Sequence, residues 1–210
     1  GRQRDDTSDL EPAAGTLVES RNSIELRGAG FGARVRLAPF GVDWRLDVDG
    51  EWIDVLRDRP TYAYAVSTRG TRIVHSAVRD EHDGYFGLGD KTGPLDHVGR
   101  RLRTRQLDAL GYDARSSDPL YKHWPFFAGL RRDRGLWYGL YVDTLSEATF
   151  DFGQEFDNYH GFYRATEIDD GDCDQWFVPG PALDRVVRGF VSLVGGTAMP
   201  PRWSLGYANT

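Results

Sequence analysis

Three segments in the middle of the chain decide its fold. They are Phe86-Gly-Leu-Gly-Asp90, Leu107-Asp-Ala-Leu-Gly-Tyr-Asp113 and Asp118-Pro-Leu-Tyr-Lys-His-Trp-Pro-Phe-Phe127. Glycines occur where the chain must turn. The acid Asp108 follows a run of alternating residues, and a cluster of proline and aromatic residues leads into an apolar strand. This order predicts a loop that is carried on a β scaffold and directed at a ligand.

Outside these segments, polar and apolar residues alternate over short stretches, which is typical of β-strands. Residues 44–48 and 51–55 flank Asp49-Gly50 and predict a hairpin, because a type I′ turn needs positive φ at both central residues. A second pair of strands, 61–66 and 71–75, is predicted around Arg69-Gly70. Further strands are predicted at 23–27, 33–38, 126–130, 136–142, 147–152, 162–166 and 175–178. Many short strands with Gly and Asp turns predict an antiparallel sandwich or barrel.

One helix is predicted near the C-terminal end. Apolar residues recur there at helical spacing from Pro181 onward, and Gly195-Gly196 end the pattern. These residues are Leu183, Val186, Val187, Phe190, Val191 and Val194. The chain then divides into a mobile lead-in (1–15), a β-sandwich domain (16–180), a linker helix (181–196) and a last segment (197–210). That segment is expected to run extended, as a strand that starts a further unit.

The composition excludes several classes of function. The chain has 210 residues, 40% of them hydrophobic, which is enough for a sizeable core. Its net charge of -6 argues against a nucleic-acid partner, because phosphate binding needs a positive field. No apolar run approaches the ~20 residues that span a bilayer, so no membrane partner is expected. Residues 1–14 contain no signal-peptide core, which favours a cytoplasmic location, although a chain that starts at Gly1 is compatible with a removed leader.

Metal and cofactor sites are not expected either. The five histidines are scattered, and the single cysteine, Cys173, excludes an intrachain disulfide. The run Asp169-Asp-Gly-Asp-Cys-Asp174 lacks the register and closing Glu of a calcium loop, so an acidic hairpin turn is the favoured interpretation. Gly87-Leu-Gly89 lies in a strand-rich context, which argues against a nucleotide site. No serine-nucleophile elbow or phosphate loop occurs.

Three arginines would share one face of a strand predicted at 100–106, namely Arg101, Arg103 and Arg105. They could form a basic patch, or a sheet face paired with carboxylates. The acidic balance of the chain favours the paired face.

The central segments resemble the N-terminal region of family 31 glycoside hydrolases, the α-glucosidase and α-xylosidase family. Gly87-Leu-Gly-Asp-Lys-Thr-Gly-Pro94 is similar to one family pattern, with Asp90 where the family has Glu. Leu107-Asp108 matches a Thr-Asp or Val-Asp step, and Asp118-Pro-Leu-Tyr-Lys122 matches fully. The order continues through Tyr138-Gly-Leu-Tyr-Val-Asp143, Phe177-Val-Pro-Gly-Pro181 and Pro200-Pro-Arg-Trp-Ser-Leu-Gly-Tyr207. Residues 1–84 match only in general character.

The resemblance implies an all-β, antiparallel β-sandwich of the galactose-mutarotase-like type. It would pack against a (β/α)8 barrel that starts at about Trp203 and needs roughly 250 further residues. Retaining glycoside hydrolysis uses two carboxyl groups about 5 to 5.5 Å apart. In this family both come from the barrel, so the chain is expected to hold no catalytic residue. The expected partners are an α-linked sugar or oligosaccharide and the barrel itself.

The resemblance also implies that Asp108 contacts sugar hydroxyl groups near the scissile bond, since a carboxylate can accept hydrogen bonds from two neighbouring hydroxyls. The alternative is that Asp108 caps a turn beside Gly111. Tyr112 and Asp113 are further substrate-binding candidates on the same loop.

Other residues of the central segments are candidates for packing. Tyr121, His123 and Trp124 could stack on a sugar or on the barrel, and packing is favoured for Trp124. Asp90 and Lys91 are expected to pair with each other.

Three functions fit this reading. The first is the accessory domain of a family 31 retaining α-glycosidase. The second is a free-standing carbohydrate-binding module. The third is an aldose mutarotase-like epimerase, which would need a histidine acid and a carboxylate base in one groove.

Overall fold

The structure is a computed structural model that describes residues 14–206. The strands are β1 (Thr16–Glu19), β2 (Ser23–Arg27), β3 (Phe31–Leu37), β4 (Phe40–Val48), β5 (Glu51–Arg57), β6 (Tyr64–Val66), β7 (Ile73–Val78), β8 (Asp83–Gly87), β9 (Arg101–Thr104), β10 (Phe126–Arg131), β11 (Leu136–Val142), β12 (Ala148–Asp151), β13 (Tyr163–Ile168) and β14 (Gln175–Pro179). The helices are α1 (Leu183–Val194) and the 3-10 helix η1 (Arg202–Leu205).

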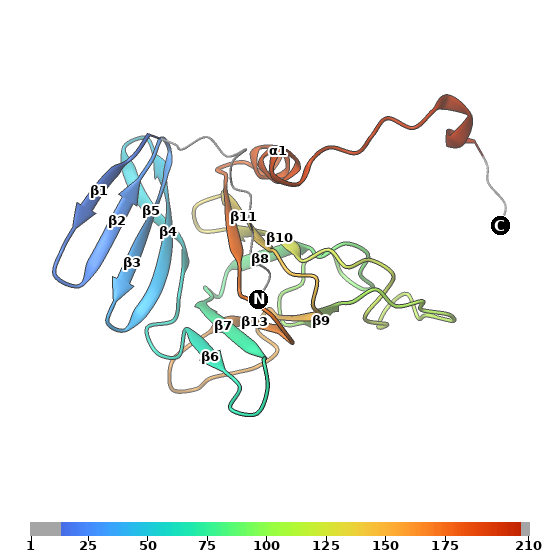
Figure 1. The fold of residues 1–210 in the computed structure, drawn as a ribbon, viewed down its shortest axis with the longest axis horizontal. Helices are drawn as coiled ribbons and strands as arrows, with labels where there is room; N and C mark the ends of the chain where they lie inside the picture. The colour runs from blue at the N-terminus through green and yellow to red at the C-terminus, as the bar shows by residue number, and fades with distance from the viewer. Residues whose placement is uncertain (1–13, 207–210) are drawn as a thin grey trace.

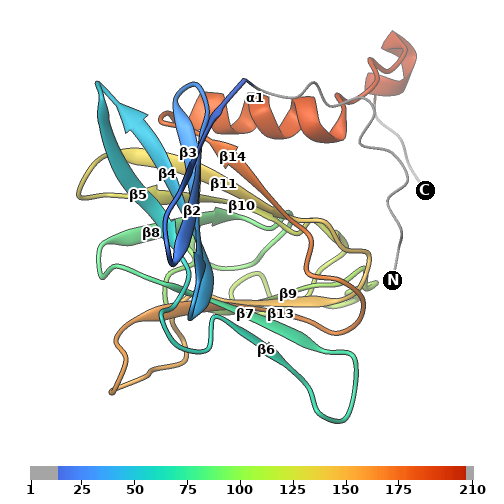
Figure 2. The same ribbon diagram turned by 60° about the vertical axis from the view of Figure 1, so that its left-hand side comes forward.

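The strands form three antiparallel sheets. Their orders are β1-β2-β3-β4-β5, β14-β11-β10-β8 and β6-β7-β13-β12-β9. The second and third sheets stack face to face, and the first stands beside them (Figures 1 and 2). The predicted antiparallel β-sandwich is therefore confirmed.

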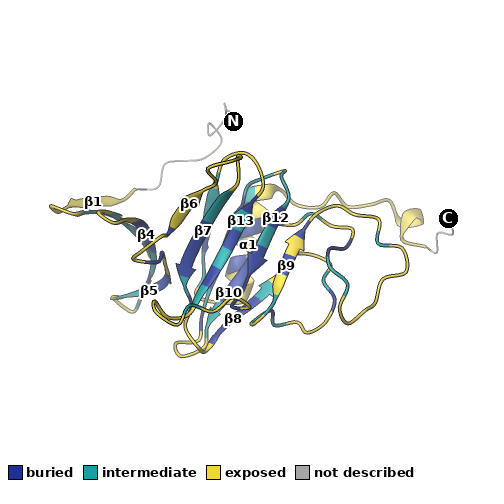
Figure 3. Cartoon of the chain, turned by 90° about the horizontal axis from the view of Figure 1, so that it is seen from below, coloured by how far each residue is buried: buried dark blue, intermediate teal, exposed yellow. Residues whose placement is uncertain are grey.

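The main core lies between the two stacked sheets. Phe127 and Leu140 from one sheet meet Phe150 and Ile168 from the other, and all four side chains are fully buried. Partly buried and buried residues alternate along β13, as the alternation of colour in Figure 3 shows. This period of two arises because successive side chains of a strand point to opposite faces. One face of β13 thus belongs to the core and the other is free for a different role.

The predicted helix is confirmed, and it begins at Leu183. It covers the outer face of the four-stranded sheet (Figure 1) through Val186 and Phe190, which are buried. The Phe190 ring stacks on Phe126 with 3.9 Å between ring centroids. The adjoining side of the helix leaves large apolar side chains exposed, namely Leu183, Val187, Val191 and Val194. Within residues 14–206, no helix is both long enough and apolar enough to cross a bilayer.

Both predicted hairpins are present. β4 pairs with β5 around Asp49 and Gly50, whose φ values of 53° and 88° are those of a type I′ turn. Asn, Asp and Gly tolerate positive φ better than other residues, so the Asp-Gly pair fixes this turn. β6 and β7 form the second antiparallel pair.

Two local predictions were wrong. The acidic run 169–174 joins β13 to β14, and these strands belong to different sheets, so it is a crossing between sheets and not a hairpin turn. Sequence patterns do not state which strands pair. The segment expected to be extended contains the 3-10 helix Arg202–Leu205. A strand needs a neighbour for its backbone hydrogen bonds, and no described strand pairs with this segment.

A buried chain of hydrogen bonds ties the three sheets together. Asp58 follows β5, and its carboxylate accepts the backbone N–H of Val42 in β4 at 2.9 Å. His75 Nε2 of β7 lies 2.6 Å from the other oxygen, and both side chains are 1% exposed. His75 Nδ1 accepts a hydrogen bond from Gln175 of β14 at 2.9 Å. The ring of Tyr64 stacks on His75, 4.9 Å between centroids.

This arrangement fixes the charge state of Asp58. Burial by itself would raise the pKa of Asp58, but the hydrogen bonds from His75 and from the Val42 N–H outweigh it, so the pKa lies below its usual value. A carboxyl group with a lowered pKa stabilises the fold above its unfolded pKa of about 3.9. That stabilisation is lost as the pH falls through the folded-state pKa.

We expect Asp58→Asn to lower the free energy of unfolding at pH 7 by about 1.5–3 kcal/mol, the range for hydrogen bonds to charged groups. Urea unfolding measures this. Because Asn does not titrate, the difference between the two proteins should shrink as the pH is lowered from 5 to 3. The control is Asp172→Asn, an exposed acid that should change stability by less than about 0.5 kcal/mol. Parallel stability curves for Asp58→Asn and the unmodified chain across this range would contradict the assignment.

Candidate functional site

The candidate site is the segment 105–125, which leaves β9 and returns at β10 without forming a strand or helix. It carries Asp108, Tyr112 and Asp113, the predicted substrate-binding residues. In Figure 1 it projects from the ends of the strands, on the same side of the molecule as residues 196–206. A loop of this length has few hydrogen bonds of its own, so its position depends on contacts with its surroundings.

The base of the loop is held by two ion pairs between the glycine-rich segment and the Asp-Pro-Leu-Tyr-Lys segment. Lys91 Nζ lies 2.9 Å from Asp118, and Lys122 Nζ lies 3.2 Å from Asp90. The expected pairing of Asp90 with Lys91 was therefore wrong. Neighbours in an irregular segment point in different directions, so each charge is paired across the fold instead.

The two ion pairs differ in burial. The Lys91 side chain is 3% exposed, and burial lowers its pKa although Asp118 raises it. Asp118 also accepts the backbone N–H of Arg103 at 2.6 Å. The Lys122–Asp90 pair is exposed on both sides. A buried pair fixes a loop more strongly than an exposed one, because water screens the exposed charges.

Neutral hydrogen bonds complete the base of the loop. Thr92 donates its hydroxyl to the carbonyl of Ser117 at 2.8 Å, and the N–H of Gly93 donates to Ala114 at 3.2 Å. His123 lies between two strand ends, with its ring nitrogens 3.1 Å from the Thr104 carbonyl and 2.9 Å from the Thr144 carbonyl. His123 therefore has a structural role.

The tip of the loop is open. Asp108 and Tyr112 are exposed, and Gly111 takes φ 66° with no atom within 4 Å of the position a side chain would occupy. Tyr121 donates a hydrogen bond to Asp108, which raises the pKa of Tyr121. The structure thus brings together Asp108, Tyr112 and Tyr121. The negatively charged carboxylate of Asp108 lies on the surface beside the hydroxyl of Tyr121.

Asp113 lies in the same loop, but its carboxylate accepts hydrogen bonds from neighbouring residues of the loop. Its Oδ1 accepts the N–H groups of Arg115 at 2.7 Å and Ser116 at 3.0 Å, and also the Ser116 hydroxyl. The Arg115 N–H and the Ser116 contacts lower the pKa of Asp113. Asp113 closes a turn, as short acidic side chains often do.

The remaining sequence candidates take packing roles. Two of the three arginines are paired with acids, as favoured from the sequence: Arg101 contacts Asp151 at 2.9 Å, and Arg105 contacts Glu147 at 2.9 Å. The Arg103 guanidinium instead donates to the backbone carbonyl of Asp118 at 3.2 Å. Trp124 packs edge-on against Phe190, 6.1 Å between centroids. Among the described residues, no group of three or more His, Cys, Asp or Glu side chains is arranged to hold a metal ion.

The sequence did not indicate the partnership of Tyr121 with Asp108, because thirteen positions of irregular chain separate them. It also gave no indication of a polar groove on the outer face of β13. Tyr163, Ala165 and Glu167 line the groove, but the buried residues between them are the polar Arg164 and Thr166, so the stretch has no clear alternation of polar and apolar residues.

The two ion pairs at the base of the loop can be tested against each other. Lys91→Met keeps the length of the side chain but leaves the Asp118 carboxylate without its cation. We expect a loss of about 1.5–3 kcal/mol of stability and faster amide hydrogen exchange in 105–117. Lys122→Met, the matched control, removes an exposed pair and should cost less than about 1 kcal/mol. Equal effects of the two substitutions on exchange would contradict the assignment of Lys91 as the anchor.

Comparison with known proteins places the chain. Residues 4–151 match the model of the glycosyl hydrolase 31 N-terminal galactose mutarotase-like domain. Alpha-glucosidase 2 of Bacillus thermoamyloliquefaciens is 32% identical over 128 residues, which cover 61% of this chain and 15% of that protein. An alpha-glucosidase of Saccharolobus solfataricus is 26% identical over 140 residues, 66% of this chain and 19% of that protein. The chain thus spans less than a fifth of either relative.

Solved structures of glycoside hydrolases have the same fold as this chain. A GH31 dextranase of Flavobacterium johnsoniae, complexed with isomaltotriose, superposes with a TM-score of 0.78 and 26% identity, covering 92% of this chain and 22% of that one. The glucosidase II alpha subunit superposes with a TM-score of 0.72 at 19% identity over 92% of this chain and 26% of that one, a likeness of fold alone. The chain belongs to glycoside hydrolase family 31, as an N-terminal domain of the galactose mutarotase-like type homologous to alpha-glucosidases.

Proposed function

We propose that this chain shapes the substrate pocket of an α-glycosidase, with Asp108 contacting sugar hydroxyl groups, while the catalytic carboxylates come from a following barrel domain. One observation carries the proposal. Asp108 is exposed at the open tip of a loop whose base is held by a buried ion pair. A carboxylate held in this way can orient a sugar at little entropic cost.

The neighbours of Asp108 support a sugar contact. Tyr121 donates its hydroxyl to Asp108, which leaves the other lone pairs of the carboxylate for ligand hydroxyls. Tyr112 and Tyr121 are half exposed and add aromatic surface beside the acid. The alternative in which Asp108 only caps a turn finds less support, because no backbone N–H of residues 109–111 donates to its carboxylate.

An exposed apolar surface supports the barrel as an intramolecular partner. Leu183, Val187 and Val191 lie on the free side of α1, and each is more than 40% exposed. The segment after the helix adds Met199, Trp203 and Leu205, also exposed. Monomeric proteins rarely leave contiguous apolar surface of this kind in water. The much greater length of the relatives supplies a domain that could cover it.

The epimerase alternative needs a histidine and a carboxylate in one accessible groove. His75 and His97 are buried, and His123 is held between two carbonyls. His82 and His160 are exposed, and His160 Nδ1 lies 3.0 Å from Asp157. No histidine lines the large groove on the outer face of β13. These positions favour the accessory-domain function over an epimerase.

Asp108 can be tested in the full-length enzyme that contains this domain. We expect Asp108→Ala to lower kcat/KM for an α-glucoside by roughly 10- to 100-fold, which corresponds to the loss of a charge-assisted hydrogen bond. Asp113→Ala is the matched control from the same loop, and it should act on loop order with a smaller effect on kcat/KM. Unchanged kcat/KM in Asp108→Ala would remove Asp108 from the substrate site.

The proposal that catalysis needs a further domain can be tested with the 1–210 chain. We expect it neither to hydrolyse 4-nitrophenyl α-glucoside nor to speed the mutarotation of glucose or galactose, because the proposed catalytic acids lie outside it. Release of 4-nitrophenol would refute that placement. Rapid mutarotation would establish the epimerase function instead.

A further inference from the structure

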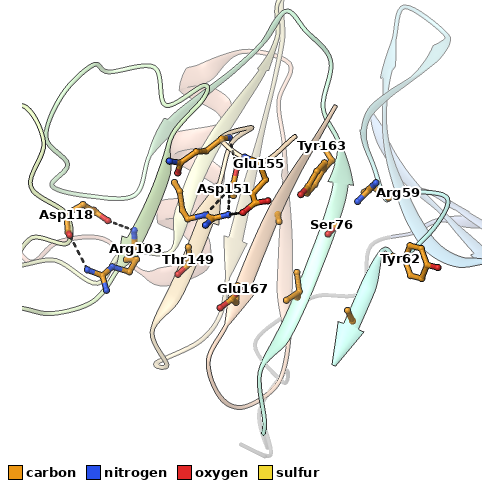
Figure 4. A pocket seen from close by; sticks show the side chains of 15 residues that line it. Arg59, Tyr62, Ser76, Arg103, Asp118, Thr149, Asp151, Glu155, Tyr163 and Glu167 are labelled. Atoms are coloured by element: carbon orange, nitrogen blue, oxygen red, sulfur yellow. Dashed lines mark hydrogen bonds and ion pairs between the residues drawn. The ribbon is translucent and has the colours of Figure 1, made fainter. Parts of the chain in front are cut away.

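The outer face of the sheet β6-β7-β13-β12-β9 carries a groove of about 790 Å³. Thr149 and Asp151 of β12 lie in it beside Ala165 and Glu167 of β13 (Figure 4), and the register places Thr149 opposite Glu167 and Asp151 opposite Ala165. Its volume falls within the range of roughly 300–1,000 Å³ typical of small-molecule sites. None of Asp108, Tyr112 or Tyr121 lines it, so it is distinct from the tip of the loop, although Asp118 at the base of the loop is part of its lining.

The carboxylates of the groove are all paired with cations. Each of its four carboxylates has a cationic partner: Asp151 and Glu155 pair with Arg101, Glu167 pairs with Arg72, and Asp118 pairs with Lys91. A cationic ligand would have to displace one of these pairs and leave a charge uncompensated. Another arginine of the lining, Arg103, donates to the Asp118 carbonyl at 3.2 Å. A neutral ligand with many hydroxyl groups can instead use the lone pairs and N–H groups that the ion pairs leave available.

The polar groups of the groove are held in place before any ligand arrives. Asp151 Oδ1 accepts the N–H groups of Gly153 and Gln154, both at 2.8 Å, while its Oδ2 contacts Arg101. Donors and acceptors fixed in this way bind a ligand without a further cost of ordering.

Aromatic surface is present as well. Tyr163 lies in the groove with the Arg59 guanidinium 4.3 Å from its ring centroid, and Tyr62 lies across from it, 78% exposed (Figure 4). Burial, together with Glu155 and Asp151, raises the pKa of Tyr163, so its hydroxyl remains a neutral hydrogen-bond donor. Amphipathic rings of this kind offer one apolar and one polar contact to the same ligand.

We propose that this groove is a second binding site, for a neutral saccharide, which acts independently of the Asp108 loop. Balanced charge, a floor of fixed polar groups and two tyrosine rings are the features that a polyhydroxylated, uncharged ligand requires. The absence of histidine from the lining residues makes it a site for binding and not for mutarotation. The proposal goes beyond the pocket-shaping function, since it concerns a different surface.

The test is a titration of the ¹⁵N-labelled 1–210 chain with maltotriose and with isomaltotriose, followed by NMR. We expect saturable shifts at residues of β12 and β13. Ala165→Trp would fill the groove without removing any ion pair, and should weaken binding by at least about tenfold, or 1.4 kcal/mol. Tyr159→Leu is the control, because Tyr159 is 93% exposed and does not line the groove. It should leave binding unchanged.

Additional variants and ligands provide further tests of the proposal. Should Ala165→Trp lose its dispersed spectrum, Gln154→Leu and Tyr62→Ala alter exposed lining residues and should each weaken binding severalfold. Asp108→Ala should leave the groove shifts unchanged. Three results would each overturn the proposal. They are the absence of saturable binding of either trisaccharide, binding that the groove variants do not affect, and tighter binding of glucuronic acid or glucosamine than of glucose. Binding lost only in Asp108→Ala would overturn it while leaving the pocket-shaping function intact.

Discussion

The hydrogen-bonded chain from Asp58 through His75 to Gln175 is the constraint on which the arrangement of this domain depends. It links β4 and the end of β5 to β7 and then to β14, so one residue from each of the three sheets is committed to it. A buried carboxylate and imidazole cannot be left unpaired without a large cost. The sheets are therefore locked in one mutual position, which apolar packing alone would specify less narrowly.

With the sheets fixed, the sandwich presents two different surfaces. The strand ends near β9 carry the long loop, which has little structure of its own and is held by Lys91 and Asp118 at its base. The outer face of β12 and β13 carries a groove whose acids are paired with arginines or lysine. Asp118 lies at both places, since it anchors the loop and lines the groove. The same ion pair thus contributes to the shape of both surfaces.

The exposed side of α1 has a different character from both. It is apolar, whereas the loop tip and the groove are polar, and the four-stranded sheet covers only part of the apolar stripe of the helix. An amphipathic helix normally has one apolar stripe. The apolar stripe of α1 is wider than the part that the four-stranded sheet covers, and its exposed part fits a domain that shares its helix with a neighbour, in keeping with the much longer chains of the related glycosidases.

The sequence by itself determined the class of fold, most of the strands, the helix and the family. Alternation along strands such as Ser23–Arg27, the Asp49-Gly50 turn and the helical spacing from Leu183 are local signals, and each was read correctly because neighbouring residues specify them. The sequence motifs around Asp108 follow one another in the order typical of the family, and this order indicated the family. The same motifs also indicated which loop projects from the scaffold.

Only the tertiary structure decided which residues meet. The pairing of Lys91 with Asp118, the contact of Tyr121 with Asp108, the crossing at 169–174 between sheets and the groove on β13 all join segments distant in the chain. Spacing in a sequence reports the faces of a single strand or helix. It carries no information on which face another element will cover, since that depends on how the free energy of burial is shared across the whole domain.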